Sequence, residues 1–404
     1  MLLESIVSRS LWNKVKSSFS NRLLHNRAWT IDRYDENLNQ SLSFRSDFKM
    51  PSIRKPNQVL IKVFASSINP LDVEMIRGYG DVVMTADFIF NRNKDILSLK
   101  RLPLVLGRDF VGRIVDKGEN VVQNQIGDIV WGTVFPFYNG SHADYVITNE
   151  ESIFLKPKNL TNVQAASIPF AALTAWSAIT TYGNCNPLNC SGKNVLILGG
   201  SGAVGNIACQ LLQNWGANVV TTSSPKTLDQ LKLLINNERC IDYNEMKIFL
   251  QQYEHNFDLI LDASSSSKTS EDNYTIVKEI MRERFENRLA AKSILPCPCN
   301  TVFITLNPPL LRNFDQNGLV FGALKNLNDV LCDTISSSRY SISYRWGFFN
   351  ENRKALEYLT MLYETNRLRL FDPKVFRFDQ AINAYNLVQN RKANGKVVLD
   401  LEAE

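Results

Sequence analysis

The sequence predicts an α/β protein in which a β-rich first domain precedes a doubly wound parallel sheet. The chain has 404 residues, which is too long for one ordinary hydrophobic core, so we expect two domains. Short apolar segments separated by Gly, Asp and Asn occur before residue 150. Beyond residue 190, an apolar strand, a glycine-rich turn, a helix and a second strand follow one another directly, as in a βαβ unit.

The overall composition is that of a globular protein, with 44% apolar and 21% charged residues. No apolar run approaches the about 18 residues of a membrane-spanning helix, so we expect none. The net charge is +5, but residues 1–26 hold four bases and one acid. The near-neutral remainder gives no electrostatic reason to expect a nucleic-acid partner.

The seven cysteines are scattered and odd in number, which predicts reduced thiols in a reducing compartment. Cys297 and Cys299 form a tight pair around Pro298. Two thiols make half a metal site at best, and no second pair stands at suitable spacing.

Residues 1–26 have the composition of a mitochondrial transit peptide: basic, serine-rich and poor in acids. Apolar residues recur at every fourth position, which places them on one side of a helix. The alternative is a disordered or surface-bound N-terminal helix. The recurring residues are Leu3, Val7, Leu11, Val15, Phe19 and Leu23.

The first domain is expected to be a compact β-barrel or sandwich, because its strands are short and joined by turn residues. We predict strands at residues 59–65, 111–115, 129–132 and 141–147. Helical patterning then appears at residues 163–179.

The second domain is predicted to bind a dinucleotide. Strand 194–198 is followed by Gly199 and by Gly200-x-Gly202-x-x-Gly205. The first glycine of this motif allows a tight turn, the second lets the backbone approach a pyrophosphate, and the third lets helix and strand pack closely. The N-terminus of helix 206–215 then presents N–H groups and partial positive charge to the phosphates.

The end of the next strand favours NADP(H) over NAD(H). An NAD enzyme usually places an acid here to hold the ribose 2′-hydroxyl. The stretch 221–226 instead contains hydroxyls and Lys226, which suit a 2′-phosphate. In the alternative interpretation Lys226 points into solvent. Residues 257–262 are read as a central strand, and residues 264–300 as a surface elaboration.

Four segments resemble the zinc-free quinone oxidoreductase branch of the medium-chain dehydrogenase/reductase superfamily. The resemblance implies a GroES-like β-barrel catalytic domain at residues 27–170 and 343–404. It also implies a Rossmann NADP-binding domain at residues 171–342, with an insertion at about 264–300. The matching segments are Asn69-Pro70-Leu71-Asp72, Gly107-Arg108-Asp109, Ala171-Ala172-Leu173-Thr174-Ala175-Trp176 and Gly395-Lys396-Val397-Val398-Leu399.

Within that branch the chain is similar to a mitochondrial, reticulon-interacting subfamily. Residues 77–80, 165–169 and 344–349 carry this likeness. It implies a mitochondrial NADPH oxidoreductase, in the matrix or also at the outer membrane, linked to ubiquinone biosynthesis. It also implies a reticulon-type membrane protein as a partner. Family members are often homodimers, but the sequence shows no interface signature.

A zinc site is not expected. Metal-dependent relatives carry Cys where Asn69 stands, and Gly-His-Glu where residues 107–109 stand. They also have a four-cysteine lobe, whereas the first cysteine of this chain is Cys185.

Without a metal, the acceptor is expected to be a conjugated carbonyl, a quinone or an enone, which takes hydride with little polarisation. Tyr79 is the candidate proton donor, because related enoyl-thioester reductases carry a tyrosine there. A packing role is the alternative. Asn69 is a candidate for fixing an acceptor oxygen, although Asn-Pro also makes a good turn. Two other functions stay open: a 2-enoyl thioester reductase, and an NADPH-binding scaffold without catalysis.

The resemblance also implies a set of cofactor contacts. Residues from the first domain would complete the pocket around the nicotinamide. Serines that replace a usual Gly-Gly after Asp262, and the segment 307–309, depart from the family pattern. The implied contacts are Ser201, Ala203 and Val204 at the pyrophosphate; Ser224 and Tyr243 at the 2′-phosphate; Leu306 near the nicotinamide; and Tyr344, Lys392, Ala393 and Asn394 from the first domain.

Overall fold

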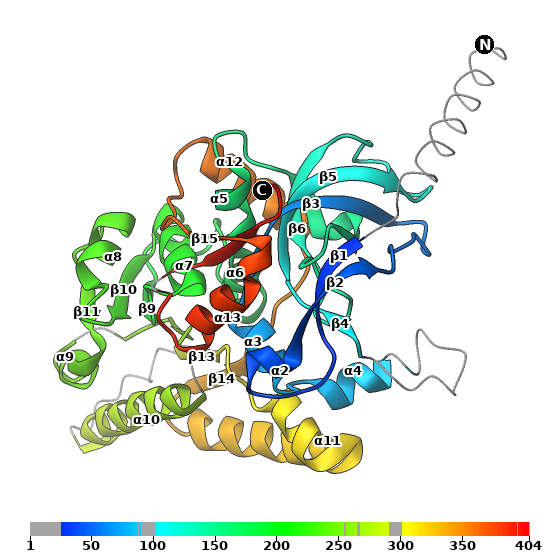
Figure 1. Cartoon of the computed structure of the whole chain (residues 1–404). Coiled ribbons are helices and arrows are strands. Elements are labelled where there is room, and N and C mark those ends of the chain that lie inside the picture. The colour runs from blue at the N-terminus through cyan, green and yellow to red at the C-terminus, as the bar shows by residue number, and fades with distance from the viewer. Residues whose placement is uncertain are drawn as a thin grey trace.

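The computed structural model describes residues 26–87, 89, 102–253, 256–264, 267–290, 301–393 and 395–403. The transit peptide expected at residues 1–26 therefore lies outside the described residues, except Asn26, which begins the first strand. Within the described ranges, no helix has the length and apolar character needed to cross a membrane. Figure 1 shows two sheet-based domains lying against each other.

The first domain contains a three-stranded sheet of order β2-β1-β4 and a seven-stranded sheet of order β15-β16-β3-β5-β6-β8, with β7 on β3. Asp144 links the two sheets. It donates its N–H to the Arg27 carbonyl (2.9 Å), and its own carbonyl accepts from Val63 (2.8 Å). Among the described strands this makes two linked sheets rather than the single closed barrel that the family resemblance implies. The strands are β1 (Asn26–Ile31), β2 (Leu42–Phe48), β3 (Gln58–Ile68), β4 (Leu104–Val105), β5 (Asp109–Lys117), β6 (Ile129–Thr133), β7 (Tyr145–Asn149), β8 (Ile153–Leu155), β15 (Lys374–Arg377) and β16 (Val397–Asp400).

Strand β3 is the centre of this domain, because it pairs with β5, β7 and β16. Its side chains are buried on both faces, which explains its nearly continuous apolar sequence. Opposite it on β5, Gly112 has no room for a side chain, because a Cβ would overlap the Lys62 carbonyl.

The second domain is a six-stranded parallel sheet of order β11-β10-β9-β12-β13-β14. This is the doubly wound order 3-2-1-4-5-6 of dinucleotide-binding domains, so the predicted fold class is confirmed for this domain. Because β14 belongs to this sheet, the expected boundary at residue 343 is wrong, and the domain extends through Trp346. The strands are β9 (Asn194–Leu198), β10 (Asn218–Ser223), β11 (Cys240–Asp242), β12 (Leu259–Asp262), β13 (Thr301–Thr305) and β14 (Ile342–Trp346).

Helices cover both faces of this sheet. One face packs with α6, α7 and α12, and the other with α9 and α10. The segment predicted to be a surface elaboration includes α10, which connects β12 to β13 and buries Val277 and Ile280 against the sheet. It is therefore a crossover helix of the fold. The helices are α2 (Leu38–Ser41), α3 (Pro70–Ile76), α4 (Asp81–Asp87), α5 (Asn162–Ala166), α6 (Pro169–Ser177), α7 (Ala203–Asn214), α8 (Leu228–Ile235), α9 (Met246–Gln252), α10 (Ser267–Ala290), α11 (Leu310–Ser338), α12 (Arg353–Glu364) and α13 (Ala381–Gln389).

The prediction that all cysteines are reduced is wrong for one pair. Cys185 and Cys190 form a disulfide with their Cα atoms 5.3 Å apart, because the turn between them folds back on itself. Cys209, Cys240 and Cys332 are free. The Cys297–Cys299 pair lies outside the described residues.

Candidate active site

The glycine loop connects β9 to α7 at the point where the strand order reverses, which is where open α/β sheets bind ligands. Gly199 has a φ of +85°, a conformation that favours glycine. A Cβ on Gly205 would overlap the Gly199 carbonyl oxygen, and one on Gly200 would overlap the Thr221 hydroxyl. The predicted close packing at Gly205 is thus present, whereas the left-handed turn residue is Gly199 rather than Gly200.

Helix α7 presents its N-terminus to this loop. Gly202 is its N-cap and supplies no side chain to the first N–H groups of the helix. Ser201, Ala203 and Val204 lie at this end, in the position that a pyrophosphate needs. Gly200 and Gly205 allow this close packing of the loop, because a Cβ on either would overlap neighbouring protein atoms. The loop and the uncapped N–H groups of α7 are the features that suit a dinucleotide pyrophosphate.

A narrow cleft of about 30 Å³ separates the glycine loop from the first domain. Ser201, Ala203 and Asn206 line one side, and Gly395 and Lys396 line the other. The structure thus brings part of the expected cofactor site against the start of β16. Lys396 was expected only as part of the closing segment, residues 395–399.

The expected 2′-phosphate contacts lie together at the carboxyl edge of the sheet. Ser223 pairs with Asp242 in the β10–β11 register, and each is the last residue of its strand. Ser224 and Tyr243 therefore immediately follow the ends of adjacent strands. Tyr243 is 55% exposed. The Ser224 hydroxyl hydrogen-bonds the Thr227 hydroxyl at 2.8 Å. The nearby Asp242 carboxylate accepts a hydrogen bond from the Asn244 backbone N–H (2.9 Å). This carboxylate therefore stabilises the turn that follows β11.

A buried polar cluster faces the cleft from the first domain. The Lys396 ammonium donates to the Asn69 Oδ1 (2.6 Å) and to Asp109 (3.0 Å). The same Asp109 oxygen accepts from Asn69 Nδ2 (2.9 Å) and from the Ser67 hydroxyl (2.5 Å). Asp109 is fully buried, while the Lys396 side chain is 11% exposed. We call Ser67, Asn69, Asp109 and Lys396 the lysine cluster.

The lysine cluster also bears on the expectation of no zinc. Asn69 and Asp109 stand where the metal-dependent relatives are expected to carry ligands, and here a lysine ammonium lies between them. Across the part of the chain that the structure describes, no group of three His, Cys, Asp or Glu side chains is arranged to hold a metal. The residues present do not fit a zinc ion.

Tyr79 follows α3 and lies at the other end of that helix from Asn69, roughly 10 Å away along a seven-residue helix. Burial raises the pKa of its phenol, an effect that Arg312 partly opposes. The adjacent Gly80 donates its N–H to Asp315 (2.6 Å), and so does Val82 (3.2 Å). Tyr79 therefore sits where the first domain touches α11, which begins just after Leu306. A phenol with a raised pKa stays protonated at neutral pH and can donate.

Tyr344 is the clearest correction among the site residues. It was expected to complete the pocket from the first domain, but it lies on β14 of the second sheet. Its ring stacks on Phe303 with centroids 5.8 Å apart and lies 4.4 Å from the ring of Tyr274. Burial raises the pKa of the Tyr344 phenol. The sequence position next to the expected domain boundary gave no signal that the residue continues the sheet.

The remaining expected contacts are more dispersed. Leu306 is half-buried just beyond β13, where its N–H donates to the Asp262 carbonyl (3.2 Å). Lys392 is exposed and Ala393 packs against the core of the first domain. Asn394 lies outside the described residues.

A buried ion pair, Asp72 with Arg108, lies next to the lysine cluster. Asp72 and Arg108 are fully buried, with Arg108 Nε 3.4 Å from the Asp72 carboxylate. Asp72 also accepts the N–H groups of Gly107 and Asn69, both at 2.8 Å. Arg108 donates to the carbonyls of Val105, Phe135, Pro136 and Tyr138. These hydrogen bonds hold the two matched motifs around Asp72 and Arg108 together, and they thereby orient the neighbouring Asn69 and Asp109.

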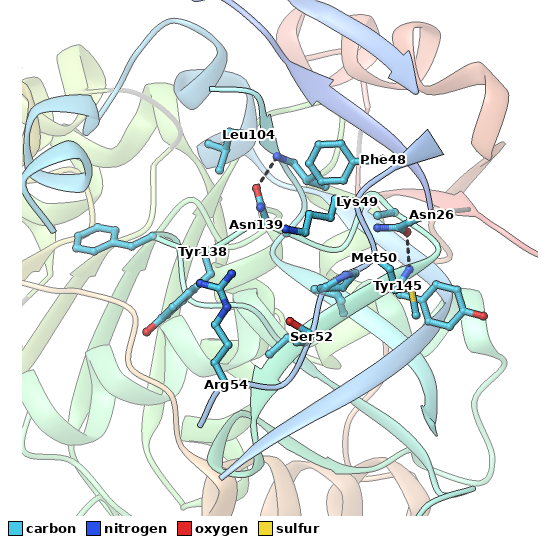
Figure 2. A pocket seen from close by; sticks show the side chains of 17 residues that line it. Asn26, Phe48, Lys49, Met50, Ser52, Arg54, Leu104, Tyr138, Asn139 and Tyr145 are labelled. Atoms are coloured by element: carbon cyan, nitrogen blue, oxygen red, sulfur yellow. Dashed lines mark hydrogen bonds between the residues drawn. The ribbon is translucent and has the colours of Figure 1, made fainter. Parts of the chain in front are cut away.

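A separate hollow of about 510 Å³ lies on the outer side of the first domain. Figure 2 shows Arg54 beside Tyr138 and Lys49 beside Asn139, with Met50 and Tyr145 on the opposite side. It shares no lining residue with the glycine-loop cleft. Hydride transfer requires the acceptor to contact the nicotinamide, so this hollow is not part of the candidate active site.

Comparison with known proteins agrees with this geometry. Residues 55–158 match the alcohol dehydrogenase GroES-like domain. The mitochondrial NAD(P)H oxidoreductase RTN4IP1 of Danio rerio is 34% identical over 93% of this chain and 91% of its own length. The human protein of that name is 33% identical over 93% and 89%. Among solved structures, the quinone oxidoreductase of Coxiella burnetii has a TM-score of 0.68 at 24% identity, covering 94% of this chain and all of its own.

The chain therefore belongs to the medium-chain dehydrogenase/reductase superfamily, in the family of NAD(P)H oxidoreductases that the RTN4IP1 proteins represent. The likeness to solved quinone oxidoreductases and to the enoyl reductase CurK, which has a TM-score of 0.65 at 20% identity over 93% of this chain and 99% of its own, supports the fold.

Proposed function

We propose that this chain transfers hydride from NADPH to a conjugated carbonyl, a quinone or an enone, without a metal. The observation that carries the proposal is the glycine loop at the N-terminus of α7, with Lys396 of the lysine cluster across a narrow cleft from Ser201 and Ala203. The loop would bind the pyrophosphate, Ser224 and Tyr243 the 2′-phosphate, and the residues near Leu306 the nicotinamide. The names of the relatives support a nicotinamide cofactor.

When bound, NADPH would supply a hydride, that is one proton together with two electrons, for transfer to one end of the conjugated system. The oxygen at the other end then gains negative charge and must take up one proton. Tyr79 is the proposed donor of that proton. Lys396 is paired with Asp109, so the lysine cluster as a whole is close to neutral. Its ammonium would act at the cleft as a hydrogen-bond donor to a developing oxyanion, rather than as a net positive charge.

The direct test offers NADPH or NADH to the full-length protein with a short-chain quinone, and in parallel with a crotonyl thioester. Quinone turnover with NADPH is the expected result. Turnover of the thioester alone would favour an enoyl thioester reductase, for which the position of Tyr79 is the supporting observation. Tight NADPH binding without turnover of either acceptor contradicts the proposal and favours a cofactor-binding scaffold.

Cofactor preference gives a second prediction. Replacing Ser224 by aspartate should place a carboxylate beside the 2′-phosphate, and like charges at that distance repel. We expect kcat/KM for NADPH to fall about 100-fold, with NADH used as well as before or better. The control is Asp229→Asn on α8, an acid one turn beyond this site, which should leave the cofactor ratio unchanged. An unchanged ratio in Ser224→Asp would remove Ser224 from the 2′-phosphate site.

Tyr79 gives a third prediction. Replacing it by phenylalanine keeps the ring and removes the proton, so we expect kcat to fall about 100-fold or more, in the range typical of lost general-acid catalysis. The dissociation constant for NADPH should stay within about twofold. Tyr145→Phe, a half-buried tyrosine outside the cleft, is the matched control. A normal kcat in Tyr79→Phe would assign that residue to packing.

The cellular setting is also a proposal. We infer a mitochondrial location from the relatives, which are named mitochondrial, with the matrix as the compartment. A function linked to ubiquinone biosynthesis would be consistent with a quinone as the acceptor. The relative in Caenorhabditis elegans is named reticulon-4-interacting protein 1, which supports a reticulon-type partner. Import assays with a tagged full-length chain, followed by fractionation, would test the compartment.

A further inference from the structure

The hollow on the outer side of the first domain, drawn in Figure 2, lies where the two sheets of that domain separate. Ala28 and Ala143 form an isolated bridge between the sheets, and the hollow opens beside Ala143. Residues of β1, β2, β4 and β7 form its walls, and the segment 49–54 after β2 forms its rim. Its volume of about 510 Å³ is in the range of about 300–1,000 Å³ that is typical of small-molecule sites.

The rim of the hollow carries positive charge without a matching acid. Lys49 and Arg54 are exposed, and neither side chain forms a hydrogen bond or an ion pair with the part of the chain that the structure describes. No Asp or Glu stands among the described residues that line the hollow. Asp144, which directly precedes β7, is already paired with Arg27 at 2.8 Å. The charge at the rim is therefore available to an anion.

Asn26, at the start of β1, supplies a buried donor to the hollow. The residue is only 2% exposed, and its Oδ1 accepts from the Tyr145 backbone N–H (3.0 Å). Because a backbone N–H can only donate, the oxygen must face Tyr145, and the NH₂ group must face away from it. That NH₂ group has no hydrogen-bond partner among the described residues. A buried donor without a partner is costly, and an acceptor oxygen in the hollow would satisfy it.

Asn139 is oriented in the same way on the other side of the hollow. Its Oδ1 accepts from the Val105 backbone N–H (3.0 Å), which turns its NH₂ group away from the backbone. Figure 2 shows Asn139 beside Lys49. The two amide NH₂ groups, the Lys49 ammonium and the Arg54 guanidinium are all donors. A carboxylate or a phosphate, which has several acceptor oxygens and negative charge, matches this set.

The floor of the hollow is apolar. Its buried residues are each at most 3% exposed: Leu104, Val105, Ala143 and Val146. A small inorganic anion at the rim would leave this floor in contact with water. A hydrocarbon chain or ring attached to the anion would cover the floor, which is favourable in proportion to the apolar area removed from water.

We propose that this hollow binds an organic anion, a carboxylate or phosphate group joined to an apolar chain. The anionic group lies between Lys49, Arg54 and the two amide NH₂ groups, and the chain lies on the apolar floor. The site is independent of the proposed reaction, because it shares no lining residue with the glycine-loop cleft.

The first test titrates the full-length protein with octanoate, in the absence of cofactor, by isothermal titration calorimetry. We expect saturable binding with a dissociation constant below about 1 mM. Octanol has the same chain without the charge and should bind at least about tenfold more weakly. Butyrate should also bind at least about tenfold more weakly, because each buried methylene strengthens binding up to about fourfold. The absence of saturable octanoate binding up to about 10 mM overturns the proposal.

The second test locates the bound anion. The double variant Lys49→Ala/Arg54→Ala should weaken octanoate binding by about tenfold or more, because it removes both cations of the rim. The matched control Lys55→Ala/Lys158→Ala removes two exposed lysines that do not line the hollow, and it should bind octanoate within about twofold of the wild type. Unchanged melting temperatures would show that both variants fold. Equal affinities of Lys49→Ala/Arg54→Ala and the wild type would place octanoate elsewhere and overturn the proposal.

The third test distinguishes a lipid headgroup from a soluble anion as the source of the ligand. The protein is sedimented with vesicles of phosphatidylcholine, with and without cardiolipin. Sedimentation that requires cardiolipin, is reversed by octanoate and is lost in Lys49→Ala/Arg54→Ala identifies a lipid phosphate. Octanoate binding without sedimentation identifies a soluble anion. Either result supports the proposal, which fails if neither octanoate nor cardiolipin binding depends on Lys49 and Arg54.

Discussion

Replacing Asp72 by asparagine is expected to lower the free energy of unfolding by about 3–5 kcal/mol, the usual cost of breaking a buried ion pair. The change keeps the size of the side chain but leaves Arg108 buried and fully charged without its carboxylate. The new amide would also turn a donor toward the N–H groups of Gly107 or Asn69, which now donate to Asp72. Chemical denaturation monitored by tryptophan fluorescence measures the loss.

The matched control is Glu74→Gln on the same helix. Glu74 pairs with Arg77 at 3.3 Å, and both side chains are exposed, so we expect a change below about 0.5 kcal/mol. Equal effects of the two substitutions would contradict a special role for the buried pair. Arg108→Met in the Asp72→Asn background should recover part of the stability, because it removes the unpaired charge.

Replacing Gly205 by alanine is expected to weaken NADPH binding by about 100-fold or more. The added methyl group would overlap the Gly199 carbonyl, and that backbone atom can move only if the loop and the start of α7 separate. The N–H groups of α7 would then no longer converge on the pyrophosphate, whose binding at a helix terminus depends on that geometry. Titration of cofactor fluorescence gives the dissociation constant.

Gly192→Ala serves as the control for the effect of the methyl group itself. Gly192 has a φ of +78° and open space around its Cβ position, so the substitution costs about 1 kcal/mol of backbone strain without a clash. It should reduce stability slightly and leave NADPH affinity within about twofold. A Gly205→Ala protein that binds NADPH normally would mean that the cofactor approaches from elsewhere.

The sequence was most informative where the determinants of structure are local. The glycine loop, its strand and its helix occupy fewer than thirty consecutive residues, and each glycine has a steric role that can be stated in advance. The hand of this βαβ unit can be stated in advance as well, because crossover connections between parallel strands are almost always right-handed.

The lysine cluster could not be predicted in this way. Lys396 and Asp109 are 287 positions apart in the sequence, and a single lysine before a strand carries no sign of its partner. The role of α10 as a crossover helix could not be predicted for a different reason. Most residues of α10 are polar, and two buried apolar residues, Val277 and Ile280, are too few to produce a clear amphipathic pattern. Tyr344 was misplaced because a chain that returns to the first domain gives no local signal of where the second sheet ends.

The contact of Asp315 with Gly80 and Val82 connects the two domains away from the cleft at Lys396. Phe64 and Trp131 of the first domain also belong to the same hydrophobic core as Val195 of the second, so the two domains cannot rotate freely apart. Opening at the glycine loop must either pivot about the Asp315 contact or break it. In the first case the loop bearing Tyr79 stays in register with the start of α11 through every cycle of cofactor exchange. In the second case, the two hydrogen bonds to Asp315 must break before the oxidised cofactor can leave. The rate of cofactor release is then limited by two hydrogen bonds that do not contact the cofactor.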